Sequence, residues 1–154
     1  MVDNICFYSS PIGLLEIHAS ETHLTKLLLN SKGGVADVVS TGVLTNCMTQ
    51  LDEYFAGRRK LFDLPLQLEG TAFQRQVWTA LQSIPYGQTI SYKQLAIKIT
   101  NPKAYRAVGT VNGHNPFPIL IPCHRVVNAN GGLGGYTGGL HIKQYLLRLE
   151  SGKS

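Results

Sequence analysis

The sequence lacks the features of a membrane or secreted protein. No apolar run approaches the roughly 18 residues that a membrane-spanning helix needs, and the leucine run at residues 27–29 is long enough only for the core of a strand. Residues 1–4 do not begin a basic segment followed by an apolar stretch, which would mark a secretory signal. We therefore expect a cytoplasmic protein without membrane attachment.

Cysteine is also scarce. The chain has 3 cysteines, Cys6, Cys47 and Cys123, which lie far apart and form no Cys-x-x-Cys pair. In a chain without a secretion signal, such cysteines are expected to be reduced thiols. Neither they nor the nearby His18 and His23 supply the closed tetrahedral ligand set of a structural zinc site, so we expect no metal.

Acidic residues are nearly absent from the second half of the chain. Residues 1–69 carry five basic and eight acidic side chains, a net charge of −3, whereas residues 70–154 carry nine basic side chains and one acid, a net charge of +8. Such asymmetry suggests that the second half faces a polyanion, most simply nucleic acid. A merely soluble basic face remains the alternative.

The composition is that of a folded protein with one domain or two very small ones. Hydrophobic residues make up 44% and charged residues 15% of the 154 positions, which argues against disorder. Short apolar segments at residues 5–8, 14–17 and 24–29, separated by turn formers, predict strands. Apolar residues then recur at helical intervals over residues 44–55, and on that face Cys47 is expected to be a small core residue.

A domain boundary is predicted between residues 62 and 70. Leucines alternate at 64, 66 and 68, as in an edge strand or an extended linker. Thr71 is a candidate helix cap, and Trp78 lies on the apolar stripe of the helix that follows, where we expect it to anchor the core. We therefore divide the chain into residues 1–69 and 70–154.

Two further helices with a tight break are predicted next. Ser91 can cap a helix over residues 92–99, and Pro102 suits the first position of a helix that runs through residues 103–108. Two helices across so short a turn, with several cations among them, resemble a helix-turn-helix.

Residues 115–127 are the most informative stretch for chemistry. Their three prolines exclude a regular helix or central strand, so the backbone follows an irregular path that the apolar residues 119–121 would bury. This path delivers Cys123, which His124 and Arg125 follow. A free thiol is mostly protonated at neutral pH, and a positive neighbourhood favours the thiolate. A buried, inert cysteine is the alternative.

A glycine-rich segment and a lone acid complete the pattern. Residues 131–139 hold six glycines, and no Gly-Lys-Ser/Thr follows, so a flexible wall around a flat ligand fits better than a phosphate loop. Glu150 is predicted on the last turn of the final helix, where the helix dipole disfavours an acid. That position suggests a specific partner, and His124 is the obvious one.

The motifs of this half resemble those of the O6-alkylguanine-DNA alkyltransferases. They are Pro-Cys-His-Arg-Val at residues 122–126, Arg-Ala-Val-Gly at 106–109 and Gly-Tyr-Thr-Gly-Gly at 135–139. The resemblance implies an α+β protein, with a small ribonuclease-H-like sheet-plus-helix domain at residues 1–69. It implies a helical domain at residues 70–154 that contains the DNA-binding helix-turn-helix and the active-site cysteine.

The same resemblance implies DNA repair by direct reversal. An alkyl group, typically methyl, would pass irreversibly from O6 of guanine in duplex DNA to Cys123, once per molecule, and O4 of thymine stays open as a second donor. The protein would be a suicidal methylated-DNA–protein-cysteine methyltransferase, a monomer that uses no cofactor. Two alternatives remain: a non-enzymatic lesion binder of the alkyltransferase-like type, against which Cys123 argues, and more distantly a thiol hydrolase.

Residue roles also follow from the resemblance. Those implied in catalysis are Cys123, His124, Glu150, Asn115 and Tyr92. Those implied in DNA binding are Arg106, Tyr92, Ala107, Gly109, Lys103 and Arg125, with Arg106 filling the gap left by a rotated nucleotide. Those implied in the base pocket are Tyr92, Val126, Tyr136, Thr137 and Gly138. The sequence departs from the family pattern at Tyr105 and His114, beside the expected DNA-binding helix.

Overall fold

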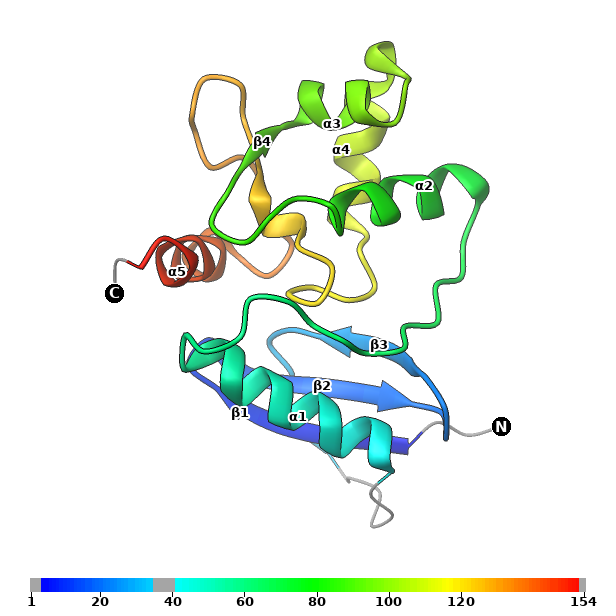
Figure 1. The fold of residues 1–154 in the computed structure, drawn as a ribbon, viewed down its shortest axis with the longest axis vertical. Helices are drawn as coiled ribbons and strands as arrows, with labels where there is room; N and C mark the ends of the chain where they lie inside the picture. Colours follow the sequence, from blue (N-terminus) through cyan, green and yellow to red (C-terminus); the bar gives the residue numbers. More distant parts are fainter. Residues whose placement is uncertain (1–3, 35–40, 153–154) are drawn as a thin grey trace. The chain divides into compact units, whose positions relative to one another are not determined.

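The computed structural model describes residues 4–34 and 41–152, and the chain divides into two compact units, Met1–Leu68 and Glu69–Ser154 (Figure 1). Over the described ranges, no helix combines the length and the apolar character that crossing a bilayer requires.

The first unit is an antiparallel sheet covered by one helix. Strands β1 (Asn4–Ser10), β2 (Gly13–Ala19) and β3 (Leu24–Leu28) pair in the order β1-β2-β3, as the turn-separated apolar segments predicted. Helix α1 (Gly42–Phe55) lies across one face of this sheet (Figure 1). The alternation along β2 explains the packing, because every second side chain from Leu15 to Ala19 is fully buried.

Two sequence predictions for this unit are confirmed. Cys47 is fully buried on the inner face of α1, as expected of a small core residue. The leucine alternation at residues 64–68 is an extended edge beside β3: Leu66 pairs in parallel with Leu24, whose N–H donates to the carbonyl of Pro65 at 2.8 Å.

The second unit is mainly helical. It contains α2 (Ala72–Leu81), α3 (Tyr92–Lys98), α4 (Tyr105–Gly113) and α5 (Leu140–Glu150), together with a two-stranded parallel sheet of β4 (Ile90–Ser91) and β5 (Val126–Val127). Thr71 and Ser91 cap α2 and α3 as predicted, each in a reciprocal capping box with a glutamine three residues later. Trp78 anchors the core as expected, with its indole N–H directed at the Val111 carbonyl at 3.3 Å.

The predicted helix pair is present, with one correction. A 3₁₀ turn, η1 (Pro102–Ala104), follows α3, and α4 begins only at Tyr105. Pro102 therefore opens the 3₁₀ turn rather than an α-helix reaching residue 108. The Ala104 N–H bonds to the Asn101 carbonyl at 3.0 Å, a spacing of three residues that closes the tighter turn.

Candidate active site around Cys123

Cys123 is the first residue of a short 3₁₀ helix, η2 (Cys123–Arg125), which follows a segment of irregular backbone. The side chain of Asn115 holds this backbone from inside: its Nδ2 donates to the Ile121 carbonyl at 2.7 Å, and its Oδ1 accepts the Phe117 N–H at 2.9 Å. Ile119 adopts φ +77°, a conformation that costs energy in a β-branched residue and requires support from its surroundings. The thiol is thus held in place by a braced turn.

The Cys123 thiol is buried, with 5% of the residue exposed, among polar neighbours. Burial raises its pKa, while the Asn115 amide, the Lys143 ammonium and the Tyr136 hydroxyl act in the opposite direction. The positive charge beside the sulfur therefore comes from Lys143. The sequence attributed the positive neighbourhood of the thiol to the flanking His124 and Arg125, but the Arg125 guanidinium is bound to Glu150 instead.

His124, Glu150 and Arg125 form a buried network next to the thiol. His124 Nε2 lies 2.7 Å from Glu150 Oε2, as the lone acid predicted. Arg125 donates from Nε and Nη2 to the two oxygens of the same carboxylate at 2.8 and 3.0 Å. Arg125 Nη1 also donates to the Ile84 carbonyl at 2.6 Å. Arg125, which the resemblance placed at the DNA, is only 6% exposed and is instead part of this network.

The network sets the protonation of both of its titratable members. Burial alone would raise the pKa of Glu150, but hydrogen bonds from His124 and Arg125 outweigh it and bring that pKa to about 2. Burial lowers the pKa of His124, and the charges of Arg125 and Lys143 lower it further, whereas Glu150 acts to raise it. Glu150 is thus a carboxylate and His124 a neutral imidazole at physiological pH.

Lys143 is the functional candidate that the sequence analysis missed. It is fully buried, and its Nζ donates to the carbonyls of Val126 at 2.7 Å and Gly135 at 3.1 Å, so it ties the cysteine segment to the glycine-rich segment. Burial lowers its pKa to about 8. A signal existed in the helical spacing, since Lys143, Leu146 and Glu150 share the buried face of α5.

Two tyrosines, Tyr92 of α3 and Tyr136 of the glycine-rich segment, lie near the Cys123 thiol. Burial raises the pKa of Tyr92 and of Tyr136, and the Cys123 sulfur adds to both effects. Gly134, at φ +73°, allows the close approach of Tyr92, because a Cβ there would lie 3.0 Å from the Tyr92 hydroxyl oxygen. The Thr137 hydroxyl already donates to the Gly113 carbonyl at 2.6 Å, so it fastens this segment to the end of α4.

Helix α4 links an exposed surface to the buried site. Arg106 and Ala107 are exposed on it, Lys103 is exposed just before it in η1, and Gly109 is partly buried facing the Tyr92 ring. Tyr105, a departure from the family pattern, lies with its ring centroid 5.8 Å from the Arg106 guanidinium. From the inner face of α4, the Asn112 amide lies 3.4 Å from the Cys123 carbonyl, a second contact that sequence reasoning missed.

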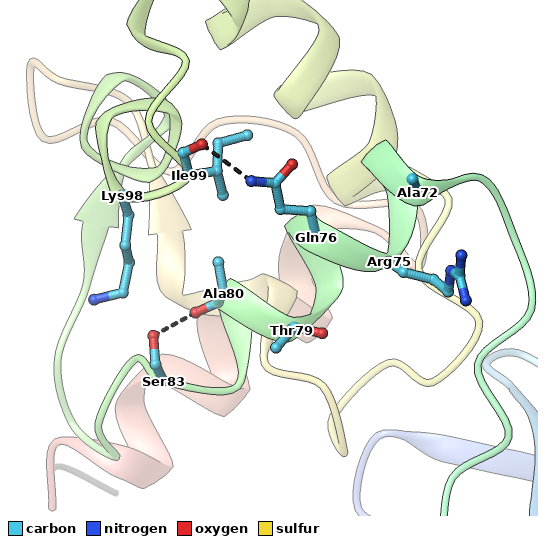
Figure 2. Close-up of a pocket in the computed structure, with 8 residues that line it drawn as sticks. All are labelled: Ala72, Arg75, Gln76, Thr79, Ala80, Ser83, Lys98 and Ile99. Atoms are coloured by element: carbon cyan, nitrogen blue, oxygen red, sulfur yellow. Dashed lines mark hydrogen bonds between the residues drawn. The ribbon is translucent and has the colours of Figure 1, made fainter.

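A separate groove between α2 and the end of α3 lacks comparable chemistry (Figure 2). Two of its polar side chains are bonded within its wall, Gln76 to the Ile99 carbonyl at 3.1 Å and Ser83 to the Ala80 carbonyl at 2.6 Å. Its lining contains no acid, no cysteine and no histidine: Ala72, Arg75, Gln76, Thr79, Ala80, Ser83, Lys98 and Ile99. Within residues 4–34 and 41–152, no group of histidine, cysteine or acidic side chains could hold a metal ion.

Comparisons with known proteins match both units. Residues 6–68 match the ribonuclease-like domain and residues 72–152 the DNA binding domain of 6-O-methylguanine DNA methyltransferase. A methylated-DNA–protein-cysteine methyltransferase of Mycolicibacterium paratuberculosis is 48% identical over 92% of this chain and 88% of that protein. The constitutive Bacillus subtilis enzyme is 43% identical over 92% of this chain and 91% of its own length.

Solved structures agree with these sequence matches. A Mycobacterium tuberculosis protein, OGT, crystallised in complex with DNA, has a TM-score of 0.87 and 44% identity, over 96% of this chain and 92% of that one. An O6-methylguanine DNA methyltransferase from Methanococcus jannaschii has a TM-score of 0.69 and 28% identity, over 95% and 93%.

Proposed function

The chain belongs to the O6-methylguanine DNA methyltransferase family, and we propose that Cys123 is the residue that accepts the alkyl group, once per molecule. The activity itself is that of a methylated-DNA–protein-cysteine methyltransferase, which repairs alkylated DNA. One observation carries the assignment of Cys123. It is a buried thiol with polar groups around it. It is followed directly by His124, whose Nε2 is hydrogen-bonded to the Glu150 carboxylate.

The transfer is a displacement at the alkyl carbon. The Cys123 sulfur forms a bond to that carbon, the bond from carbon to guanine O6 breaks, and its electron pair stays on the guanine. The thiol proton leaves the sulfur and a proton is returned to the guanine, so a thioether and an unmodified guanine remain. Because a thioether is not hydrolysed, each molecule reacts once. No cofactor enters this balance.

His124 is positioned to take the thiol proton. Its Nε2 faces the Glu150 carboxylate and therefore carries the hydrogen, which leaves Nδ1 as the basic nitrogen. Nδ1 is buried and has no hydrogen-bond partner among the described residues. We assign to it the role of proton acceptor from Cys123 through a bridging water, with Glu150 stabilising the imidazolium that forms.

The leaving guanine is stabilised by hydroxyl groups near the sulfur. Tyr92 and Tyr136 both lie close enough to Cys123 for its charge to raise their pKa, and we assign them to the developing negative charge on the base. The Tyr136 hydroxyl is buried and interacts with the Cys123 thiol. The pocket would also include Val126, Thr137 and Gly138, where the Thr137 hydroxyl is already engaged and acts as a support.

Duplex DNA is the proposed partner of the helix pair α3–α4. The second unit carries the excess of positive charge, and Arg106 is exposed on α4 where it can enter the base stack. Ala107 and Gly109 add little bulk to α4, so the helix can approach the DNA closely, and the exposed Lys103 just before it can contact a phosphate. Asn112 then connects this helix to the Cys123 backbone. We propose that a cytoplasmic monomer performs the reaction.

The test is the mass of the protein after it meets a duplex oligonucleotide with a single O6-methylguanine. We expect the intact mass to rise by one methyl group, peptide mapping to place it on Cys123, and repaired lesions to equal the protein molecules. The Cys6→Ser variant is the matched control and gains the same mass. Tight binding of the lesion without a mass change would instead support the alkyltransferase-like lesion binder, and repeated turnover would contradict transfer to the protein.

A further inference from the structure

Arg125 is a buried cation to which the proposed reaction gives no task. It lies two residues after Cys123, yet its guanidinium points into the protein and binds both oxygens of Glu150. A third contact, to the Ile84 carbonyl at 2.6 Å, fixes the end of the side chain, and its guanidinium carbon lies 5.7 Å from the centre of the Tyr86 ring. A bidentate pair of this kind is directional and costly to bury.

We infer that Arg125 is a positioning residue that keeps His124 neutral until the thiol proton arrives. The inference rests on the proposed role of His124 as the proton acceptor. Glu150 Oε2 accepts hydrogen bonds from both His124 Nε2 and Arg125 Nη2, so the charge of the carboxylate is already balanced before any imidazolium forms. A carboxylate with His124 as its sole partner would instead draw a proton onto Nδ1 and abolish its acceptor function.

The charged and titratable groups around His124 support this assignment. From α5 come the Glu150 carboxylate and the Lys143 ammonium, from η2 come Arg125 and the Cys123 thiol, and Tyr86 and Tyr136 lie close enough to Glu150 to feel its charge. Burial is the largest effect that opposes a charge on His124, and of these groups Arg125 and Lys143 oppose it further. Arg125 is the cation that shares a carboxylate oxygen with the imidazole, so its removal should have the larger effect.

The experiment measures the imidazole pKa of His124 by NMR titration of the unreacted protein. In Arg125→Met we expect this pKa to rise, and in Glu150→Gln we expect it to fall, because Arg125 then acts without its counter-charge. The double variant Arg125→Met/Glu150→Gln should lie above Glu150→Gln alone. If Arg125→Met does not fold, Arg125→Lys keeps a cation without the two-pronged contact and should show a smaller rise.

The rate of reaction with free O6-benzylguanine provides the second readout, since this substrate does not depend on DNA binding. A rise of one unit in the imidazole pKa lowers the neutral fraction about tenfold below that pKa. Because burial already lowers the His124 pKa, pH 6 is not far below it, so the ratio of the rates at about pH 8 and about pH 6 should increase severalfold rather than tenfold in Arg125→Met. Arg148→Lys, an exposed arginine on the neighbouring helix α5, is the matched control and keeps the wild-type ratio.

Two results would overturn the inference. One is a His124 pKa that stays unchanged or falls in both Arg125 variants. The other is an equal loss of rate at both pH values, which would leave Arg125 with a purely structural role. Failure of the wild-type protein to react would count against the proposed function alone, because the titration does not depend on activity.

Discussion

Cys47 and Cys123 are both buried thiols, and their surroundings differ in kind. Cys47 is fully buried on α1, and burial, with a smaller effect from Cys6, raises its pKa to about 12. Cys123 is nearly as buried, yet an amide, an ammonium and a phenol act against the effect of burial on its pKa. Depth alone therefore does not separate an inert cysteine from a reactive one, whereas the polar groups around the sulfur do.

Removal of the Glu150 charge should lower the reactivity of Cys123 most, and so bring it closest to the inert Cys47. In Glu150→Gln the imidazole of His124 loses the anion that stabilises its protonated form, so it becomes a weaker base. We expect the reaction with free O6-benzylguanine to slow about a hundredfold at neutral pH, within the range for a general base. Single-turnover assays that are quenched at set times measure this rate. Glu21→Gln, an exposed acid in the first unit, should react at the wild-type rate; an equally fast Glu150→Gln would show that the pair is not catalytic.

Removal of the Lys143 charge should have a smaller effect of the same direction. Lys143→Met keeps the length of the side chain but deletes the cation that favours the Cys123 thiolate. We expect the thiol pKa, followed by thiolate absorbance, to rise and the rate with free O6-benzylguanine to fall about tenfold, as one unit of pKa implies. Lys98→Met, at the exposed end of α3, serves as the control. An unchanged thiol pKa would assign Lys143 to holding the Val126 and Gly135 carbonyls only.

Substitution of Arg106 tests whether the reactivity of the Cys123 thiol depends on DNA binding. Arg106→Ala should lower repair in duplex DNA by about tenfold or more, because it removes a side chain that offsets the unstacking cost of a few kcal/mol. With free O6-benzylguanine the same variant should react at the wild-type rate, since the polar surroundings of the sulfur are intact. Parallel assays on the two substrates give this ratio. Equal losses on both would remove the role of Arg106 in the base stack.

The comparison of the two thiols also shows where sequence reasoning succeeded. Local signals were sufficient for the sheet and the helix caps: alternation predicted β2, and Thr71 and Ser91 each began a helix as predicted. The helical intervals around Cys47 predicted its burial. Each of these features depends on residues a few positions apart, and the interactions that decide them are therefore visible in a short window of sequence.

The site was only partly predictable because its contacts join distant residues. Glu150 and His124 were paired correctly on the argument that a lone acid at a helix end needs a partner. Arg125 was misplaced because neighbours in sequence can point in opposite directions, and a 3₁₀ turn directs its side chain away from the thiol toward α5. Lys143 was missed because a lysine is expected to be exposed, and only the fold shows the two carbonyls that satisfy it.

The smallest expected effect concerns Cys47 itself. Cys47→Ala removes one buried sulfur from an apolar site, so the first unit should lose about 1 kcal/mol of stability through the small cavity that remains. The alkyl-transfer rate should not change, because no group that acts on Cys123 is altered. Denaturant unfolding and the single-turnover assay measure the two quantities on the same sample. Cys47→Ser should be less stable than Cys47→Ala, because it buries a hydroxyl group at a fully buried position. A loss of rate in Cys47→Ala without a loss of stability would show that the two thiols are not independent, and the contrast between them would then no longer rest on local surroundings alone.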